Sequence, residues 1–140
     1  MSDPASRRLG LTRVAFACHE IDDIARRQAG FTLGEGASRH VLLTSRRIPR
    51  RDLSGGRLFW ILKHRLVARQ AILGVDEIAG EVGQIAAIRL APDIIRVEPR
   101  HYRAHQGWRY LPEENWPADS GPGEPLPPGL AAELAGLSLI

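Results

Sequence analysis

Hydrophobic positions recur with two different periods along the chain, and these periods divide it into short elements. Near the N-terminus, Ile21, Ile24 and Ala25 share one face at three- and four-residue spacing, which predicts a helix over residues 20–29. Acidic residues begin this segment and arginines end it, as the helix dipole favours. Elsewhere, alternation or a short apolar run predicts strands. The predicted strands are residues 11–17, 40–46, 57–63, 66–73, 84–90 and 94–98.

The two ends of the chain differ in pattern from the middle. Residues 1–10 are mostly polar and are predicted to form a flexible arm, and residues 11–111 a single domain. Six prolines fall between Pro112 and Pro128, which excludes a central strand or a helix interior there. Leu130, Leu134 and Leu137 then form one stripe, which predicts a C-terminal helix that docks on the domain. Residues 112–140 are thus predicted to be a proline-rich acidic tail.

Strands outnumber helices in this pattern, and they point to a fold class. The five consecutive apolar residues 58–62 predict a central strand that is covered on both faces. Pro49 is expected to start one helical turn over residues 50–53, which Gly55 and Gly56 end. We therefore predict an α+β fold with a mainly antiparallel, strongly curved sheet or small barrel. One short helix is expected near each end of the chain.

Composition narrows the function classes. The chain has 140 residues and one cysteine, Cys18, which excludes an intrachain disulfide and a multi-thiolate zinc site. It has neither a GxxxxGK[ST] nor a GxGxxG phosphate-binding motif. No apolar run approaches the ~18 residues of a membrane-spanning helix. We expect a soluble cytoplasmic protein that binds no cofactor, no metal and no membrane.

The placement of charge changes this picture most. Of 19 cationic residues, only Lys63 is a lysine. Residues 39–69 hold nine cations and one acid, Asp52, a balance of +8. Residues 113–140 hold five acids and no lysine or arginine. Clustering of this kind predicts an anionic, phosphate-bearing partner.

The first candidate site is the loop predicted between two strands. It carries Arg46, Arg47, Arg50 and Arg51 around Pro49. Guanidinium groups form bidentate hydrogen bonds with phosphate oxygens, and glycines such as Gly55 and Gly56 let a backbone approach a ligand. The alternative is a solvated loop whose arginines pair with the acidic tail.

The second candidate site lies between residues 100 and 111. Arg100, Arg103 and Arg109 alternate there with Tyr102, Trp108 and Tyr110. Aromatic rings that stack on bases, next to arginines that hold the backbone, are typical of proteins that bind single-stranded nucleic acid. The alternative, which we favour for Trp108, is that Trp108 and Tyr110 fix a long loop to the sheet.

Two smaller features remain. Arg69 and Gln70 are polar residues inside a predicted strand, so they face either a groove or the outer surface. His64, His101 and His105 are candidate acids or bases for a hydrolase. The spacing of His101 and His105 suits a metal on a helix, but Pro99 and Gly107 disfavour a helix there.

Several blocks of the sequence resemble a known family. They are residues 55–63 (GGRLFWILK), 69–73 (RQAIL), 106–111 (QGWRYL) and the closing PPGLAAELAGL. Through these blocks the chain resembles a bacterial family known only as domain of unknown function 1489. The resemblance covers nearly the whole chain, from Leu11 to the end. This resemblance implies a bacterial protein and supplies no activity. The chain departs from the family pattern at Lys63-His64-Arg65, where we expect a glycine-bearing turn.

A looser likeness is to small RNA-binding barrels of the PUA and ASCH type, through the short helix, the basic loop, the GG turn and an acidic turn at Asp76-Glu77. We predict a phosphate-binding module for RNA or a nucleotide. The predicted binding residues are Arg46, Arg47, Arg50, Arg51, Arg69, Arg100, Arg103, Trp108, Arg109 and Tyr110. The alternatives are a phosphodiester or nucleotide hydrolase that uses a histidine, and a protein–protein interaction domain. A homo-oligomer through the basic face and the acidic tail is a further prediction.

Overall fold

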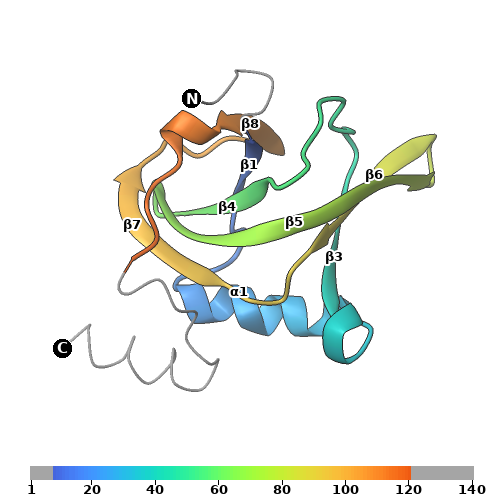
Figure 1. Ribbon diagram of the computed structural model, residues 1–140, viewed down its shortest axis with the longest axis horizontal. Coiled ribbons are helices and arrows are strands. Elements are labelled where there is room, and N and C mark those ends of the chain that lie inside the picture. Colours follow the sequence, from blue (N-terminus) through green and yellow to red (C-terminus); the bar gives the residue numbers. More distant parts are fainter. Residues whose placement is uncertain (1–7, 121–140) are drawn as a thin grey trace.

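The computed structural model describes residues 8–120, which form one curved sheet with a helix at one end (Figure 1). The helix is α1 (Ile21–Gln28). The strands are β1 (Leu9–Val14), β2 (Thr32–Leu33), β3 (His40–Ser45), β4 (Arg57–Leu62), β5 (Arg65–Ala79), β6 (Gln84–Leu90), β7 (Ile95–His101) and β8 (Trp108–Pro112). Short 3₁₀ turns lie at Ala29–Phe31, Gly36–Ser38 and Glu113–Asn115.

The sheet is mixed and open. Its strands follow the order β2-β3-β6-β5-β4-β1-β8, and β7 pairs with the first part of β5. β1 runs parallel to β4, while the other pairings are antiparallel. The predicted α+β class and curved sheet agree with this structure, and the parallel β1–β4 pair is the departure from the mainly antiparallel pairing that we predicted. The alternative of a small barrel is wrong, because the sheet is open. The parallel pair forms because α1, β2 and β3 intervene before the chain returns beside β1 as β4.

β4 is the central strand, as its apolar run predicts, and it carries a core on each face. Leu58, Trp60 and Leu62 belong to the larger core, which also holds Leu11 of β1 and Ile24 of α1. Phe59 and Ile61 face the other way and pack with Leu66, Val97 and Leu111. Because successive residues of a strand point to opposite faces, β1 is divided in the same way.

Helix α1 forms where the periodicity predicts it, and a polar network holds it to the sheet. Gln70 of β5 is fully buried, and its side chain exchanges hydrogen bonds with that of Gln28 at 2.6 and 2.9 Å. Gln70 also accepts a hydrogen bond from Trp60 Nε1 at 2.8 Å and donates one to the Ala91 carbonyl at 2.9 Å. Gln70 therefore faces neither a groove nor the outer surface, and its buried polar atoms are satisfied.

β5 is longer than predicted. It continues through Gly74 to Ala79, so Asp76 and Glu77 belong to a strand and not to a turn. At Gly74 the register with β6 shifts, and a Cβ there would lie 2.2 Å from a guanidinium nitrogen of Arg89. The bulge expected at Gly74 therefore exists, but the strand continues past it because residues 74–79 pair with β6.

The β4–β5 hairpin turns through Lys63 and His64. Both residues have positive φ values, 52° and 59°, which is the geometry of a type I′ turn. Asn-Gly is the usual choice for this turn, so Lys63 and His64 adopt the left-handed region at a cost. The His64 carbonyl accepts a hydrogen bond from the Tyr102 backbone N–H at 2.9 Å, which holds the turn against the segment after β7.

Two predicted elements differ in the structure. The helical turn over residues 50–53 is absent, because Asp52 Oδ1 accepts hydrogen bonds from the N–H and hydroxyl of Ser54 and directs the chain into a tight turn instead. β8 was not predicted: the alternation in Trp108–Pro112 is hidden among basic and aromatic residues. Gly56 approaches backbone and not a ligand, since a Cβ there would lie 2.2 Å from the Leu9 carbonyl oxygen.

Most of the predicted tail and its C-terminal helix, together with most of the N-terminal arm, lie outside the described residues. Within residues 8–120, no helix is both long enough and apolar enough to cross a bilayer.

Candidate functional site

The arginine loop that follows β3 is held in place by two aromatic residues of β8. Trp108 Nε1 donates a hydrogen bond to the Arg47 carbonyl at 2.9 Å. The Tyr110 hydroxyl accepts hydrogen bonds from the backbone N–H groups of Arg50 and Arg51 at 3.0 and 3.2 Å. Folding therefore brings residues 46–51 and strand β8, some sixty positions apart, into direct contact.

Trp108 supports the loop and offers no surface for a base. Its side chain is 2% exposed, and the Arg47 guanidinium lies 3.8 Å from its ring centroid. Arg51 lies over Tyr110 in the same way at 5.4 Å. Stacking on an aromatic ring fixes a guanidinium plane while its N–H groups stay available at the edges. The loop thus presents oriented arginine side chains, and Trp108 has the structural role that we favoured.

Arg13 is a site residue that the sequence analysis did not identify. It lies on β1 with the same parity as Leu11 and Ala15, so its side chain starts from the face of the larger core. Its Nη1 reaches across to β3, where the Thr44 carbonyl lies 3.5 Å away. Burial lowers the pKa of this guanidinium. The signal that could have identified it is an arginine at an inward-facing position of a predicted strand.

Arg13 and the loop line one groove of about 850 Å³. Thr44, Ser45, Arg46 and Arg47 line it from the end of β3, and the β5–β6 hairpin lines it with Glu81 and Gln84. We call this hollow the basic groove, since three arginines and one acid line it. Within residues 8–120, no carboxylate forms an ion pair with Arg13, Arg46 or Arg47. The groove therefore holds cationic groups without a carboxylate partner in the described part of the chain.

Other predicted arginines are already paired. Arg69 is 8% exposed, and its Nε and Nη2 donate to the two carboxylate oxygens of Asp119 at 2.7 Å each. Arg50 forms an exposed ion pair with Glu77 at 2.7 Å. The predicted phosphate role of Arg69 stays a prediction, but its guanidinium is held inside the fold and lines none of the groove.

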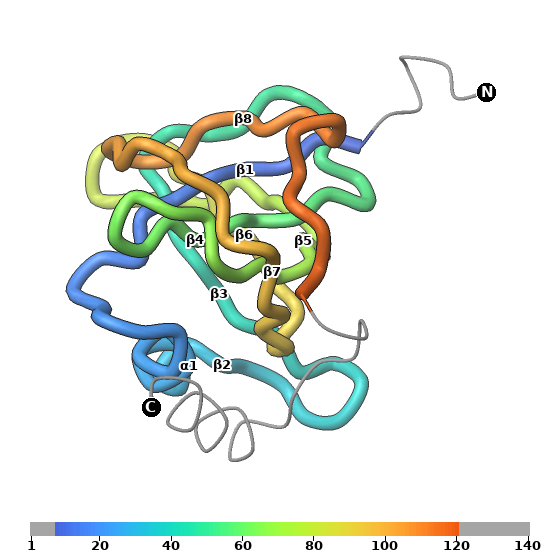
Figure 2. Tube along the Cα trace, turned by 90° about the vertical axis from the view of Figure 1, so that its left-hand side faces the viewer, coloured from blue at the N-terminus to red at the C-terminus, as the bar shows by residue number. Residues whose placement is uncertain are grey.

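The second predicted group of arginines is dispersed. Arg100 lies on β7, which is across the molecule from the 46–51 loop (Figures 1 and 2), and it donates to the Asn115 carbonyl at 2.8 Å. Arg103 is exposed in the segment after β7. Arg109 is exposed on β8, where it alternates with Trp108 and Tyr110 and therefore points to the opposite face. Of this group, the structure brings only Trp108 and Tyr110 to the loop.

The candidate histidines do not meet in one cavity. His64 accepts a hydrogen bond from the Ala104 N–H at 3.3 Å at the β4–β5 turn, and His101 is exposed at the end of β7. His105 shares a 2.7 Å hydrogen bond with the Thr12 hydroxyl. Burial lowers the pKa of His105, and the nearby Arg109 and Arg47 act in the same direction. Among residues 8–120, no cluster of three or more His, Cys, Asp or Glu is arranged to hold a metal.

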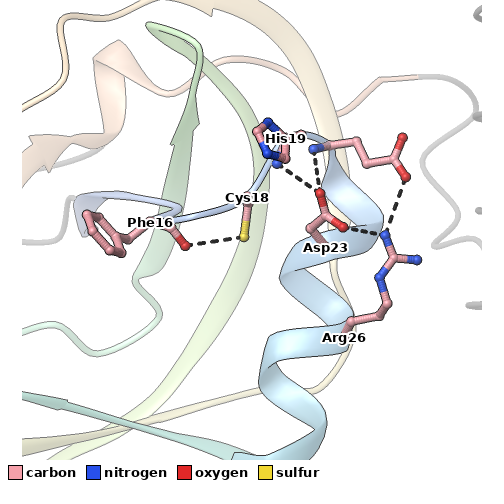
Figure 3. A network of polar contacts seen from close by, with 6 residues as sticks. Phe16, Cys18, His19, Asp23 and Arg26 are labelled. Atoms are coloured by element: carbon pink, nitrogen blue, oxygen red, sulfur yellow. Dashed lines mark hydrogen bonds and ion pairs between the residues drawn. The ribbon is translucent and has the colours of Figure 1, made fainter.

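A second, mainly apolar hollow of about 150 Å³ adjoins the basic groove, and Arg13 lines both. We call it the apolar pocket. It lies between β1, α1 and β3, and it contains Cys18, whose Sγ donates to the Phe16 carbonyl (Figure 3). Asp23 accepts from the His19 and Glu20 backbone and pairs with Arg26, which fixes the start of α1 beside the pocket.

Comparison of the chain with curated proteins found no match, and comparison with solved structures also found none. The likeness to PUA and ASCH barrels therefore stays a prediction. A family model described as a protein of unknown function, DUF1489, matches residues 11–140. Because this match spans nearly the whole sequence, the chain belongs to the DUF1489 family.

Proposed function

We propose that the protein is a phosphate-binding module that holds RNA or a nucleotide in the basic groove. The observation that carries this proposal is the convergence of Arg13, Arg46 and Arg47 on one hollow, with no carboxylate partner in the described part of the chain. Unpaired guanidinium groups in a concave site attract anions and hold phosphate oxygens through two N–H groups at once.

The preorganisation of the loop supports the same proposal. Arg47 is held by its stacking on Trp108 and by the hydrogen bond to its carbonyl, so less side-chain freedom is lost when a phosphate binds. Arg13 projects from a strand, which positions a side chain more precisely than a loop does. Ser45 and Thr44 add hydroxyl groups to the lining of the groove.

The test is fluorescence anisotropy with short single-stranded RNA and DNA at several salt concentrations. If three arginines each neutralise one phosphate, log K should fall against log salt with a slope of about −2 on single strands. Arg46→Gln should weaken binding and reduce that slope by about 0.7. Arg47→Lys keeps the charge but loses the planar stacked group, so it should weaken binding as well.

The matched control is Arg65→Gln. Arg65 is exposed at the start of β5 beside β7, across the molecule from the loop, and its substitution removes the same charge. Equal weakening by Arg46→Gln and Arg65→Gln would mean that only net charge attracts the ligand, and the groove would lose its role. Absence of binding at low salt would overturn the proposal itself.

A further inference from the structure

The aromatic surface that a single strand needs is present, but not where the sequence analysis placed it. Phe16 is 78% exposed and Phe31 is 60% exposed, and both line the apolar pocket. The Phe16 side chain is turned to solvent where the chain bends at the next residue, Ala17, whose backbone is left-handed with φ of 61°. The Phe16 ring points away from the polar network at the start of α1 (Figure 3).

The apolar pocket has the size and lining for one aromatic ring. Its volume of about 150 Å³ equals that of an apolar cavity that admits benzene. Ile24, Val41 and Leu43 form its apolar lining, and Arg13 and Arg27 add two cations. The apolar lining suits the faces of an aromatic ring, and the two arginines suit a phosphate linked to that ring.

The backbone of β3 adds hydrogen-bonding groups on the same side. β2 pairs only with His40 and Val41, so residues 42–45 pair with β6 on one side and with no described strand on the other. Leu42 and Leu43 from this stretch line the apolar pocket, and Thr44 and Ser45 line the basic groove. Apart from the Thr44 carbonyl, which Arg13 Nη1 already contacts, the backbone groups on this edge that have no strand partner are suited to the donors and acceptors of a base edge.

We propose that the apolar pocket binds an unpaired pyrimidine whose phosphate lies against Arg13, with Phe16 and Phe31 as stacking partners. This inference rests on the proposed function and names its ligand class: a pyrimidine nucleotide, free or within a single strand. Arg13 joins the two hollows, so neighbouring phosphates of a strand continue along Arg46 and Arg47. Base stacking on aromatic side chains and phosphate contacts with arginine are the two parts of single-strand recognition.

Cys18 allows a direct test on the unaltered protein. It is the single cysteine of the chain and lines the apolar pocket, so its rate of alkylation by iodoacetamide reports occupancy there. Oligouridylate should slow alkylation of Cys18, and oligoadenylate and an RNA duplex should slow it less, since a purine is larger and a duplex has no free base. Protection by uridine monophosphate as well would assign the site to pyrimidine nucleotides in general. Protection by the oligomer alone would assign it to a strand.

Substitutions at the exposed rings give an independent readout. Phe16→Ala and Phe31→Ala should each weaken oligouridylate binding roughly 5- to 150-fold, the equivalent of one stacked base. Phe16→Tyr keeps a ring and should keep binding. Leu73→Ala is the matched control, because Leu73 is 53% exposed on β5 and lines neither the apolar pocket nor the basic groove.

The two proposals fail in different ways. Oligouridylate could bind with the salt slope expected for the basic groove and yet leave the rate of Cys18 alkylation unchanged, while Phe16→Ala and Phe31→Ala bind it as tightly as wild type. That result would overturn the pyrimidine site and leave the proposed function standing. If no oligonucleotide and no uridine monophosphate binds at low salt, both are overturned.

Discussion

Asp119 holds the most deeply buried cation that the structure describes, so removing its carboxylate should destabilise the protein strongly. The Arg69 side chain is 9% exposed, that of Asp119 is 23% exposed, and two hydrogen bonds of 2.7 Å join them. Burial lowers the pKa of the nearby Arg57, and repulsion from Arg69 acts in the same direction. Asp119→Ala therefore leaves the Arg69 guanidinium buried without a counter-charge and with a second cation close by.

Breaking a buried pair from one side typically costs about 3–5 kcal/mol, and partial exposure of Asp119 places the expected loss near 3 kcal/mol. With a urea m-value of about 1.5 kcal/mol per M, the unfolding midpoint should fall by about 2 M. Glu77→Ala is the matched control, because it removes a carboxylate from an exposed pair with Arg50. That loss should stay below about 1 kcal/mol.

A double variant and a pH series make this test sharper. Arg69→Met with Asp119→Leu removes both charges, so it should be more stable than Asp119→Ala alone. The hydrogen bonds from Arg69 lower the pKa of Asp119 below its ordinary value of 3.8. The carboxylate therefore stabilises the fold above that value, and the stabilisation is lost as the pH falls through the lowered pKa. Asp119→Ala and wild type should converge in acid. A midpoint within experimental error of wild type at neutral pH would refute this account of Arg69.

Two further predictions concern local structure. The hydrogen bond from Arg26, with those from the His19 and Glu20 backbone, lowers the pKa of Asp23 to about 2, so Asp23 should stabilise the start of α1 above pH 3.8 and lose that effect toward pH 2. NMR titration of the carboxyl carbon checks this value, and a midpoint near 3.8 would contradict it. At the β4–β5 turn, Lys63→Asn should raise the free energy of unfolding by about 0.5–1 kcal/mol, because asparagine tolerates a positive φ better than lysine. Lys63→Ala keeps the strain and should give no gain in urea unfolding, and equal stability of the two variants would argue against strain at this turn.

The local elements were predictable where one period dominated the sequence. In β4 and in α1 every buried residue is apolar. The spacing of the apolar residues in the sequence therefore predicted where each element lies. β8 was missed because only Trp108 and Leu111 are buried in it, while Arg109 and Pro112 are exposed. The polar second half of β5 was missed for a similar reason: hydrogen bonds to β6 form that part of the strand, and all four residues from Asp76 to Ala79 are exposed.

The pairing of distant segments was not predictable from local pattern. β1 lies parallel to β4 because residues between them fold into α1, β2 and β3, and nothing in either strand alone encodes that neighbour. The contact of Trp108 and Tyr110 with the arginine loop likewise depends on this topology. The prediction that Trp108 fixes a loop rested on the general tendency of tryptophan to be buried. In the structure Trp108 is indeed buried, and its Nε1 holds the loop through the Arg47 carbonyl.

Charge clustering located the candidate site only roughly, because charge counted along a sequence ignores pairing in space. Two arginines of the basic stretch over residues 39–69 are paired with acids outside that stretch: Arg69 with Asp119, and Arg50 with Glu77. These two arginines therefore add little free positive charge. Arg13 lies outside the basic stretch, yet it lines both hollows and pairs with no carboxylate among the described residues. The quantity that decides anion binding is therefore the number of guanidinium groups that folding leaves unpaired in one concave place. On that measure Arg13, Arg46 and Arg47 outweigh the larger number of arginines whose charge the fold already satisfies or disperses.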